Sequence, residues 1–196
     1  MANVGVDVGA ILGPGWADGP ALEREASREV IMDLTDLELL SRAVERLMGR
    51  ETFAATLERL ENELSRSDRT FVWESVDLGS VSCELPEGIR SCWVFHLRRD
   101  VPSGAHYHPN SVQHMAMIRG KGTSSVGGVL SAMVPFASPE ASLADRWLII
   151  AQGVPHEFTP DGGSMTVVSF HTCHADELVE IDCETGAARF YEVPDA

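Results

Sequence analysis

Beyond Arg69 the chain carries short runs of β-branched and aromatic residues, separated by clusters of Gly, Pro, Asp and Ser. Eight such runs follow one another without a helical pattern of apolar residues between them. The predicted strands are Thr70–Val76, Val81–Leu85, Cys92–Leu97, Val112–Arg119, Ser124–Pro135, Arg146–Ala151, Met165–His171 and Ala188–Val193. Strands of this length at this spacing, without intervening helices, indicate a single antiparallel β-barrel or sandwich.

Two amphipathic helices are predicted ahead of the strands. Thr35-Asp36-Leu37-Glu38 has the form of a capping box, and Gly49 is expected to end the first helix. The two apolar stripes are Leu37, Leu40, Val44 and Leu47, then Phe53, Leu57, Leu60 and Leu64. We expect a helical hairpin over residues 23–68 that packs on a barrel of residues 69–196, with residues 1–22 as a flexible arm. A dimerisation helix is the alternative role.

Three of the seven histidines lie within nine residues: His106, His108 and His114. His106 and His108 are two residues apart, so on a β-strand their side chains point to the same face. Two imidazoles that converge on one point are what a first-row metal ion needs from one strand. The pattern therefore predicts a metal site.

The composition excludes several classes of protein. A formal net charge of −15 disfavours nucleic-acid binding, which needs clustered Lys and Arg. Residues 101–144 carry a net charge of only +1, as expected for a desolvated pocket with neutral ligands. The four cysteines form no CxxC pair, no apolar run approaches the roughly 20 residues of a membrane helix, and the N-terminal residues lack a basic n-region. We expect a reduced, cytoplasmic protein that does not bind membranes.

The residues around the histidines resemble the two motifs of the cupin superfamily. In the first motif His106, His108 and Gly120 match, and Gln113 takes the place of the usual Glu, with six residues between it and Gly120. Asp100 stands where the leading Gly would be, and Gly104 is the alternative for that turn. The second motif matches at Gly153 and His156, whereas Asp145, Ala151 and Pro160 depart from it. The resemblance covers residues 70–193 and implies a cupin-type β-barrel (a double-stranded β-helix or jelly roll).

By that resemblance His106, His108 and His156 would be metal ligands, with Gln113 in the fourth position. His114 competes for that position. Only one of these two neighbours can face inward in a regular strand, and we expect Gln113 there, since it has the family spacing; a β-bulge would reverse them. His171 ends a predicted strand and is a candidate catalytic residue, as is His114; a surface position is the alternative for His171.

The resemblance and the ligand chemistry together predict a metal-dependent enzyme. Neutral imidazoles favour Fe(II), Zn(II), Ni(II) or Cu(II) over Mg(II), and a weak Gln ligand leaves room for substrate or O₂. We expect Fe(II), with Zn, Ni, Mn or Cu as alternatives. We expect a mononuclear Fe(II) oxygenase that acts on a small, anionic organic substrate. The alternatives are a Lewis-acid lyase, isomerase or hydrolase, and a non-catalytic small-molecule-binding cupin. By the same resemblance the protein would be a homodimer, with residues 1–22 as the exchanging arm.

Overall fold

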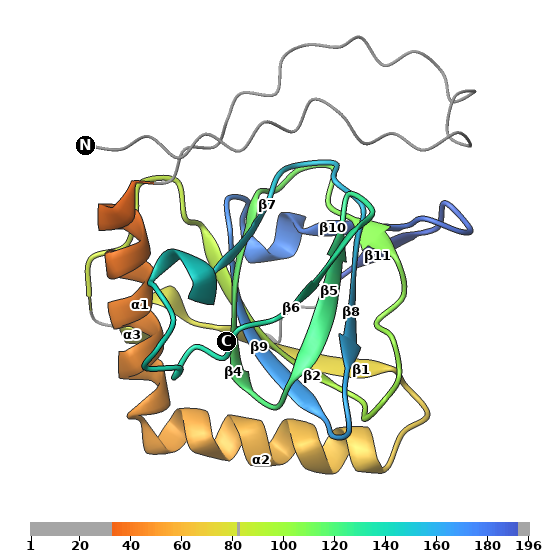
Figure 1. Cartoon of the computed structure of the whole chain (residues 1–196), viewed down its shortest axis with the longest axis horizontal. Coiled ribbons are helices and arrows are strands. Elements are labelled where there is room, and N and C mark those ends of the chain that lie inside the picture. Colours follow the sequence, from red (N-terminus) through yellow and green to blue (C-terminus); the bar gives the residue numbers. More distant parts are fainter. Residues whose placement is uncertain (1–32, 82, 192–196) are drawn as a thin grey trace, which may run out of the picture. The chain divides into compact units, whose positions relative to one another are not determined.

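Two antiparallel β-sheets are the main elements of the computed structural model, which describes residues 33–81 and 83–191 (Figure 1). The five-stranded sheet has the order β1 (Phe71–Val76), β2 (Ser91–Leu97), β9 (Met165–His171), β4 (Gln113–Arg119) and β7 (Leu148–Ile150). The six-stranded sheet has the order β11 (Ala188–Phe190), β10 (Val179–Asp182), β3 (His106–Tyr107), β8 (His156–Pro160), β5 (Gly122–Val126) and β6 (Val129–Ala132). This architecture confirms the expected mainly antiparallel fold behind N-terminal helices.

The two predicted helices are present as α1 (Leu34–Met48) and α2 (Glu51–Ser65). All eight residues of the two predicted apolar stripes are buried. Asp33 caps α1 by accepting from the Thr35 amide, so the helix begins one residue before the predicted capping box. Figure 1 shows α1 and α2 turning a corner at Gly49, each along the sheets rather than along the other helix.

The five-stranded sheet has two apolar faces, because successive side chains of a strand point to opposite sides. One face packs against the helices and includes the cross-strand row Val94, Val168 and Ala116. The other face fills the space between the sheets and includes the next row, Phe95, Val167 and Met117. Strands β2, β4 and β9 are therefore apolar on both sides, and every second residue faces the barrel interior.

Some predicted elements differ from those observed. Over Val81–Leu85 the described residues form no strand; instead a short helix, α3 (Leu78–Val81), begins where the Asp77 carboxylate accepts from the Gly79 amide. Two further short helices, η1 (Ala144–Arg146) and η2 (Ala175–Glu177), lie in connections. Strands β8 and β10 were not predicted, and β3 was expected only from its His-x-His spacing, because their pairing partners come from distant segments of the chain.

Two expectations depend on other parts of the chain. The proposed arm of residues 1–22 lies outside the described residues, so the homodimer that it would form stays a prediction. Among the described residues, none of the helices is long and apolar enough to cross a lipid bilayer.

The packing of α1 on the sheet predicts a large loss of stability when its stripe is truncated. Leu40 is fully buried, so Leu40→Ala should lower the free energy of unfolding by about 2–5 kcal/mol through lost contacts and a cavity. Leu34, at the start of the same helix, is 61% exposed, so Leu34→Ala should stay within about 0.5 kcal/mol of the unsubstituted protein. Denaturant unfolding measures both; equal losses would show that α1 is not part of the core.

Candidate metal centre

Three histidines meet between β3 and β8. His106 opens β3 and pairs directly with His156, which opens β8, while His108 follows β3 by one residue. All three side chains are buried, and one ring nitrogen of each lies within 4.8 Å of those of the other two. The residues brought together are thus the three that the motifs predict, from segments about 50 residues apart in the sequence.

Backbone carbonyls determine which nitrogen of each ring carries the proton. His106 Nδ1 lies 2.8 Å from the Gly104 carbonyl oxygen, His156 Nδ1 lies 2.9 Å from that of Val154, and His108 Nδ1 lies 2.8 Å from that of Val179. A carbonyl oxygen only accepts hydrogen bonds, so each Nδ1 is the donor. In the neutral ring the lone pair is therefore on Nε2, the atom left to bind a metal.

Burial keeps two of these rings neutral. It lowers the pKa of His108 to about 4, with a contribution from the neighbouring His106. Burial likewise holds the pKa of His156 well below its ordinary value. A neutral imidazole is the form that coordinates metals, so the protonation states suit a metal site.

Glycines shape the backbone just before two of the histidines. Gly104 and Gly153 both have positive φ, 89° and 76°, a region that favours glycine over residues with a Cβ. Gly104 also supplies the carbonyl that orients His106, and the Gly153 amide donates to the His108 carbonyl at 2.8 Å. Asp100 also has positive φ, 56°, so the chain turns both at the motif's leading position and at Gly104.

Two buried polar atoms at this site have no hydrogen-bond partner. They are His156 Nε2 and Gln113 Oε1. Gln113 Nε2 donates to Ser169 Oγ at 2.9 Å, which leaves its carbonyl oxygen as the free group. Buried groups of this kind are costly unless something binds them. A nitrogen lone pair and an amide oxygen are both metal donors, so the residues present fit a divalent transition metal.

His114 lies on the other side of β4 from Gln113. Its partner in the ladder is Phe170, which belongs to the core under the helices, and the Asp36 carboxylate of α1 acts on it electrostatically. The irregularity in β4 comes later, between Met117 and Arg119, and so does not reverse the two residues. Of the two competitors, Gln113 lines the pocket with His106 and His108, and His114 does not reach it.

His171 is buried in the barrel behind the cluster. Its ring centre lies 5.2 Å from that of His108, but both its nitrogens have hydroxyl partners: Ser111 Oγ at 3.2 Å and Ser169 Oγ at 2.9 Å. Burial holds its pKa well below the ordinary value. Ser169 Oγ is shared with Gln113, so His171 connects to the site through that hydroxyl.

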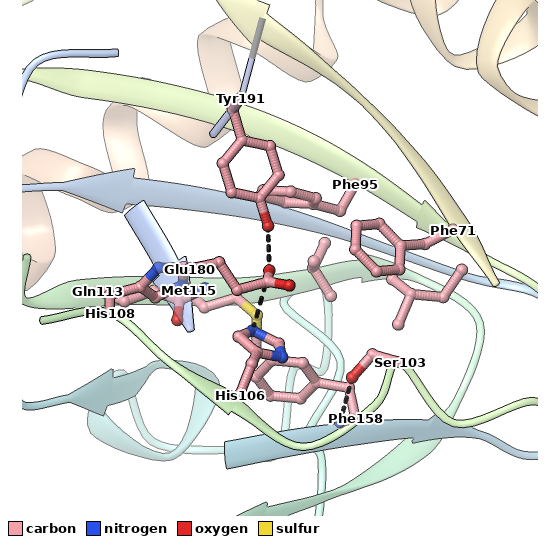
Figure 2. Close-up of a pocket in the computed structure, with 12 residues that line it drawn as sticks. Phe71, Phe95, Ser103, His106, His108, Gln113, Met115, Phe158, Glu180 and Tyr191 are labelled. Carbon is pink, nitrogen blue, oxygen red and sulfur yellow. Dashed lines mark hydrogen bonds and ion pairs between the residues drawn. The ribbon is translucent and has the colours of Figure 1, made fainter. Parts of the chain in front are cut away.

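The pocket beside the histidines is mostly apolar and small. Figure 2 shows its lining residues, which include Phe71, Phe95, Met115, Phe158 and Tyr191. Its volume is about 30 Å³. This space suits a metal ion with water-sized ligands or the reactive end of a small molecule.

One pocket residue was missed by the sequence reasoning. Glu180 is 4% exposed, and its Oε2 lies 3.6 Å from His106 Nε2. A weak signal was available, since Val179-Glu180-Ile181-Asp182 alternates apolar and acidic residues as a half-buried strand does. The signal was obscured because the surrounding segment is acidic and resembles a solvated tail.

Comparison with known proteins gives structural likenesses only. No protein-family model matches the sequence, and no curated protein matches it. The chain is similar to a cupin-2 domain from Rhodospirillum rubrum, with 13% identity over 63% of this chain and 67% of that one and a TM-score of 0.39. The Cnp3 cupin domain of Schizosaccharomyces pombe has 10% identity over 53% and 65%, with a TM-score of 0.40.

A salicylate 1,2-dioxygenase from Pseudaminobacter salicylatoxidans is also similar. It has 11% identity over 63% of this chain and 34% of that one, with a TM-score of 0.46. The chain thus spans between about one third and two thirds of the length of these proteins.

The geometry predicts that each chain binds one divalent ion. His156→Ala removes a donor whose Nε2 has no other partner, so the affinity for Zn(II) should fall more than about 100-fold. His174→Ala is the control, because His174 is exposed in the connection after β9. Competition with a chromophoric chelator measures both affinities, and equal affinities would exclude His156 as a ligand.

Proposed function

We propose that this protein is a metal-dependent enzyme of the cupin type that acts on a small organic molecule, most specifically as a mononuclear Fe(II) oxygenase. The observation that supports this proposal is the set of three buried imidazoles, each oriented by a backbone carbonyl so that the lone pair on its Nε2 is free to bind a metal ion. Imidazole suits Fe, Zn, Ni and Cu, and an iron centre with open positions would supply the chemistry of O₂ activation.

The remaining residues give this site its other properties. Gln113 is held by Ser169 and presents an amide oxygen, which is a weaker donor than a carboxylate and adds no charge. The apolar lining excludes water and strengthens the electrostatic interactions of any bound ligand. His171 is the proposed group for moving protons, and Ser169 is its hydrogen-bonded connection to Gln113.

Size and charge restrict the substrate. A pocket of about 30 Å³ favours a small molecule, or a larger one with only its reactive end inside. An anionic substrate was expected because neutral ligands leave the charge of the ion uncompensated. Glu180 adds a carboxylate to the same pocket, so an anionic group would be accommodated only where it approaches the ion itself.

The oxygenase proposal predicts O₂ uptake that depends on Fe(II) and on His106. Protein stripped of metal, reloaded anaerobically with Fe(II) and mixed with a panel of small hydroxy acids, thiols and phenols should consume O₂ in an oxygen electrode. His106→Ala should abolish the uptake, because it removes a buried donor of the cluster, while the exposed His174→Ala should retain it.

Other outcomes point to the alternative functions. Turnover of a substrate without O₂, by protein that co-purifies with Zn or Ni, would replace the oxygenase with a Lewis-acid enzyme. Ligand binding without consumption by metal-free protein would replace it with a non-catalytic binding protein. Elemental analysis of the purified protein is the first measurement, since it separates these cases.

A further inference from the structure

Glu180 is a buried carboxylate on the same face as the histidines. Strand β10 pairs with β3 so that Asp182 lies opposite His106, and Glu180, two residues away, points to the same side as Asp182. Glu180 is the one carboxylate among the described residues that line the pocket. Its position therefore follows from the strand register that places His106.

Two neighbours hold this carboxylate in place. The Tyr191 hydroxyl donates to Oε2, and Arg189, directly opposite in the β10–β11 ladder, forms an ion pair in which its Nη1 lies 2.9 Å from Oε1. Burial and the Glu180 charge raise the pKa of Tyr191 well above its ordinary value, so this hydroxyl stays a donor. Figure 2 shows Tyr191, Glu180 and His106 in a row across the pocket.

Tyr191 is itself fixed by aromatic packing. Its ring centre lies 5.1 Å from that of Trp73, 5.5 Å from that of Trp93 and 5.8 Å from that of Phe95. Arg189 lies over the Phe71 ring at 5.1 Å. The two residues that hold the Glu180 carboxylate are thus themselves fixed by packing, as the residues that orient metal ligands commonly are.

When the His106 ring is neutral, no hydrogen atom lies between its Nε2 and the Glu180 carboxylate. His106 donates from Nδ1 to the Gly104 carbonyl, so its Nε2 carries a lone pair towards Glu180 Oε2, 3.6 Å away. Two electron-rich atoms facing each other in a buried site repel unless a cation lies near both. Two ligand atoms of one ion, each about 2.1 Å from it, are at most about 4.2 Å apart.

We propose that Glu180 supplies the negative charge of the metal centre, stabilising from beside His106 the ion that the three histidines bind. The inference rests on the proposed metal function and assigns to Glu180 the charge that the amide of Gln113 does not provide. Tyr191 and Arg189 are positioning residues that keep the carboxylate on the metal-facing side of His106. A centre with this charge holds a divalent ion more tightly than three imidazoles and an amide alone.

The test is the affinity for Zn(II), measured on the full chain by competition with a chromophoric chelator. Glu180→Gln keeps the shape and the hydrogen-bond acceptor for Tyr191 and removes the charge, so the affinity should fall about 10- to 100-fold. Glu184→Gln removes the same charge from an exposed turn after β10 and should leave the affinity within about twofold. Melting of the metal-free proteins verifies that each variant is folded.

A second variant tests whether the charge of Glu180, rather than its fit in the pocket, determines the affinity for Zn(II). In the Glu180→Gln background, Gln113→Glu returns a carboxylate to the pocket from β4 and should recover at least about tenfold of the lost affinity. A purely structural role of Glu180 would not be rescued from another strand. No recovery in a folded double variant would therefore overturn the proposal.

The outcomes distinguish this inference from the function on which it rests. If the unsubstituted protein binds Zn(II) and His156→Ala does not, but Glu180→Gln binds as tightly as the unsubstituted protein, the role of Glu180 is wrong and the metal site remains. If the unsubstituted protein binds no Zn(II), both are overturned. Equal losses in Glu180→Gln and Glu184→Gln would indicate a long-range effect of net charge and would also overturn the inference.

Discussion

Three hydrogen bonds from imidazole Nδ1 atoms to backbone carbonyls are the interactions on which the rest of the site depends. They fix the tautomer and the ring orientation of His106, His108 and His156. Each Nε2 therefore carries a lone pair that can bind a metal ion between the three rings. Two of the carbonyls lie two residues before the histidine that they orient, which makes those bonds local. The third comes from Val179 of β10, and this strand also carries Glu180.

The strict alternation of side chains in the five-stranded sheet separates structural from chemical residues. Gln113 and His171 lie side by side in the β4–β9 ladder and face the interior, while their neighbours His114 and Phe170 face the helices. The helices make this possible, because they bury the second face and let the strands be apolar on both sides. Up to the irregularity after Met117, the environment of a polar residue in these strands thus depends on whether its position is odd or even.

The charge of the pocket differs from what the neutral histidine-rich segment suggested. Residues 101–144 are nearly uncharged, and Gln113 stands where a carboxylate was expected from the cupin resemblance. The carboxylate in the pocket instead comes from Glu180, more than 60 residues later, on a short strand that pairs with β3. Its partners Arg189 and Tyr191 follow within the same C-terminal segment, so one part of the chain brings both the charge and its support.

The sequence by itself determined the class of fold, the two helical stripes and the three histidines, because strand alternation, helical spacing and the His-x-His pattern are local properties. It also favoured Gln113 over His114, and the structure agrees, since the bulge in β4 lies beyond both residues. Local signals failed where pairing is made by distant segments. Strands β3 and β10 are two and four residues long, too short for a periodic signal. The segment Val81–Leu85 resembles a strand, but those of its residues that the structure describes belong to neither sheet. Only the tertiary structure placed Glu180 beside His106, because that contact depends on the register of two short strands that lie more than 70 residues apart in the sequence.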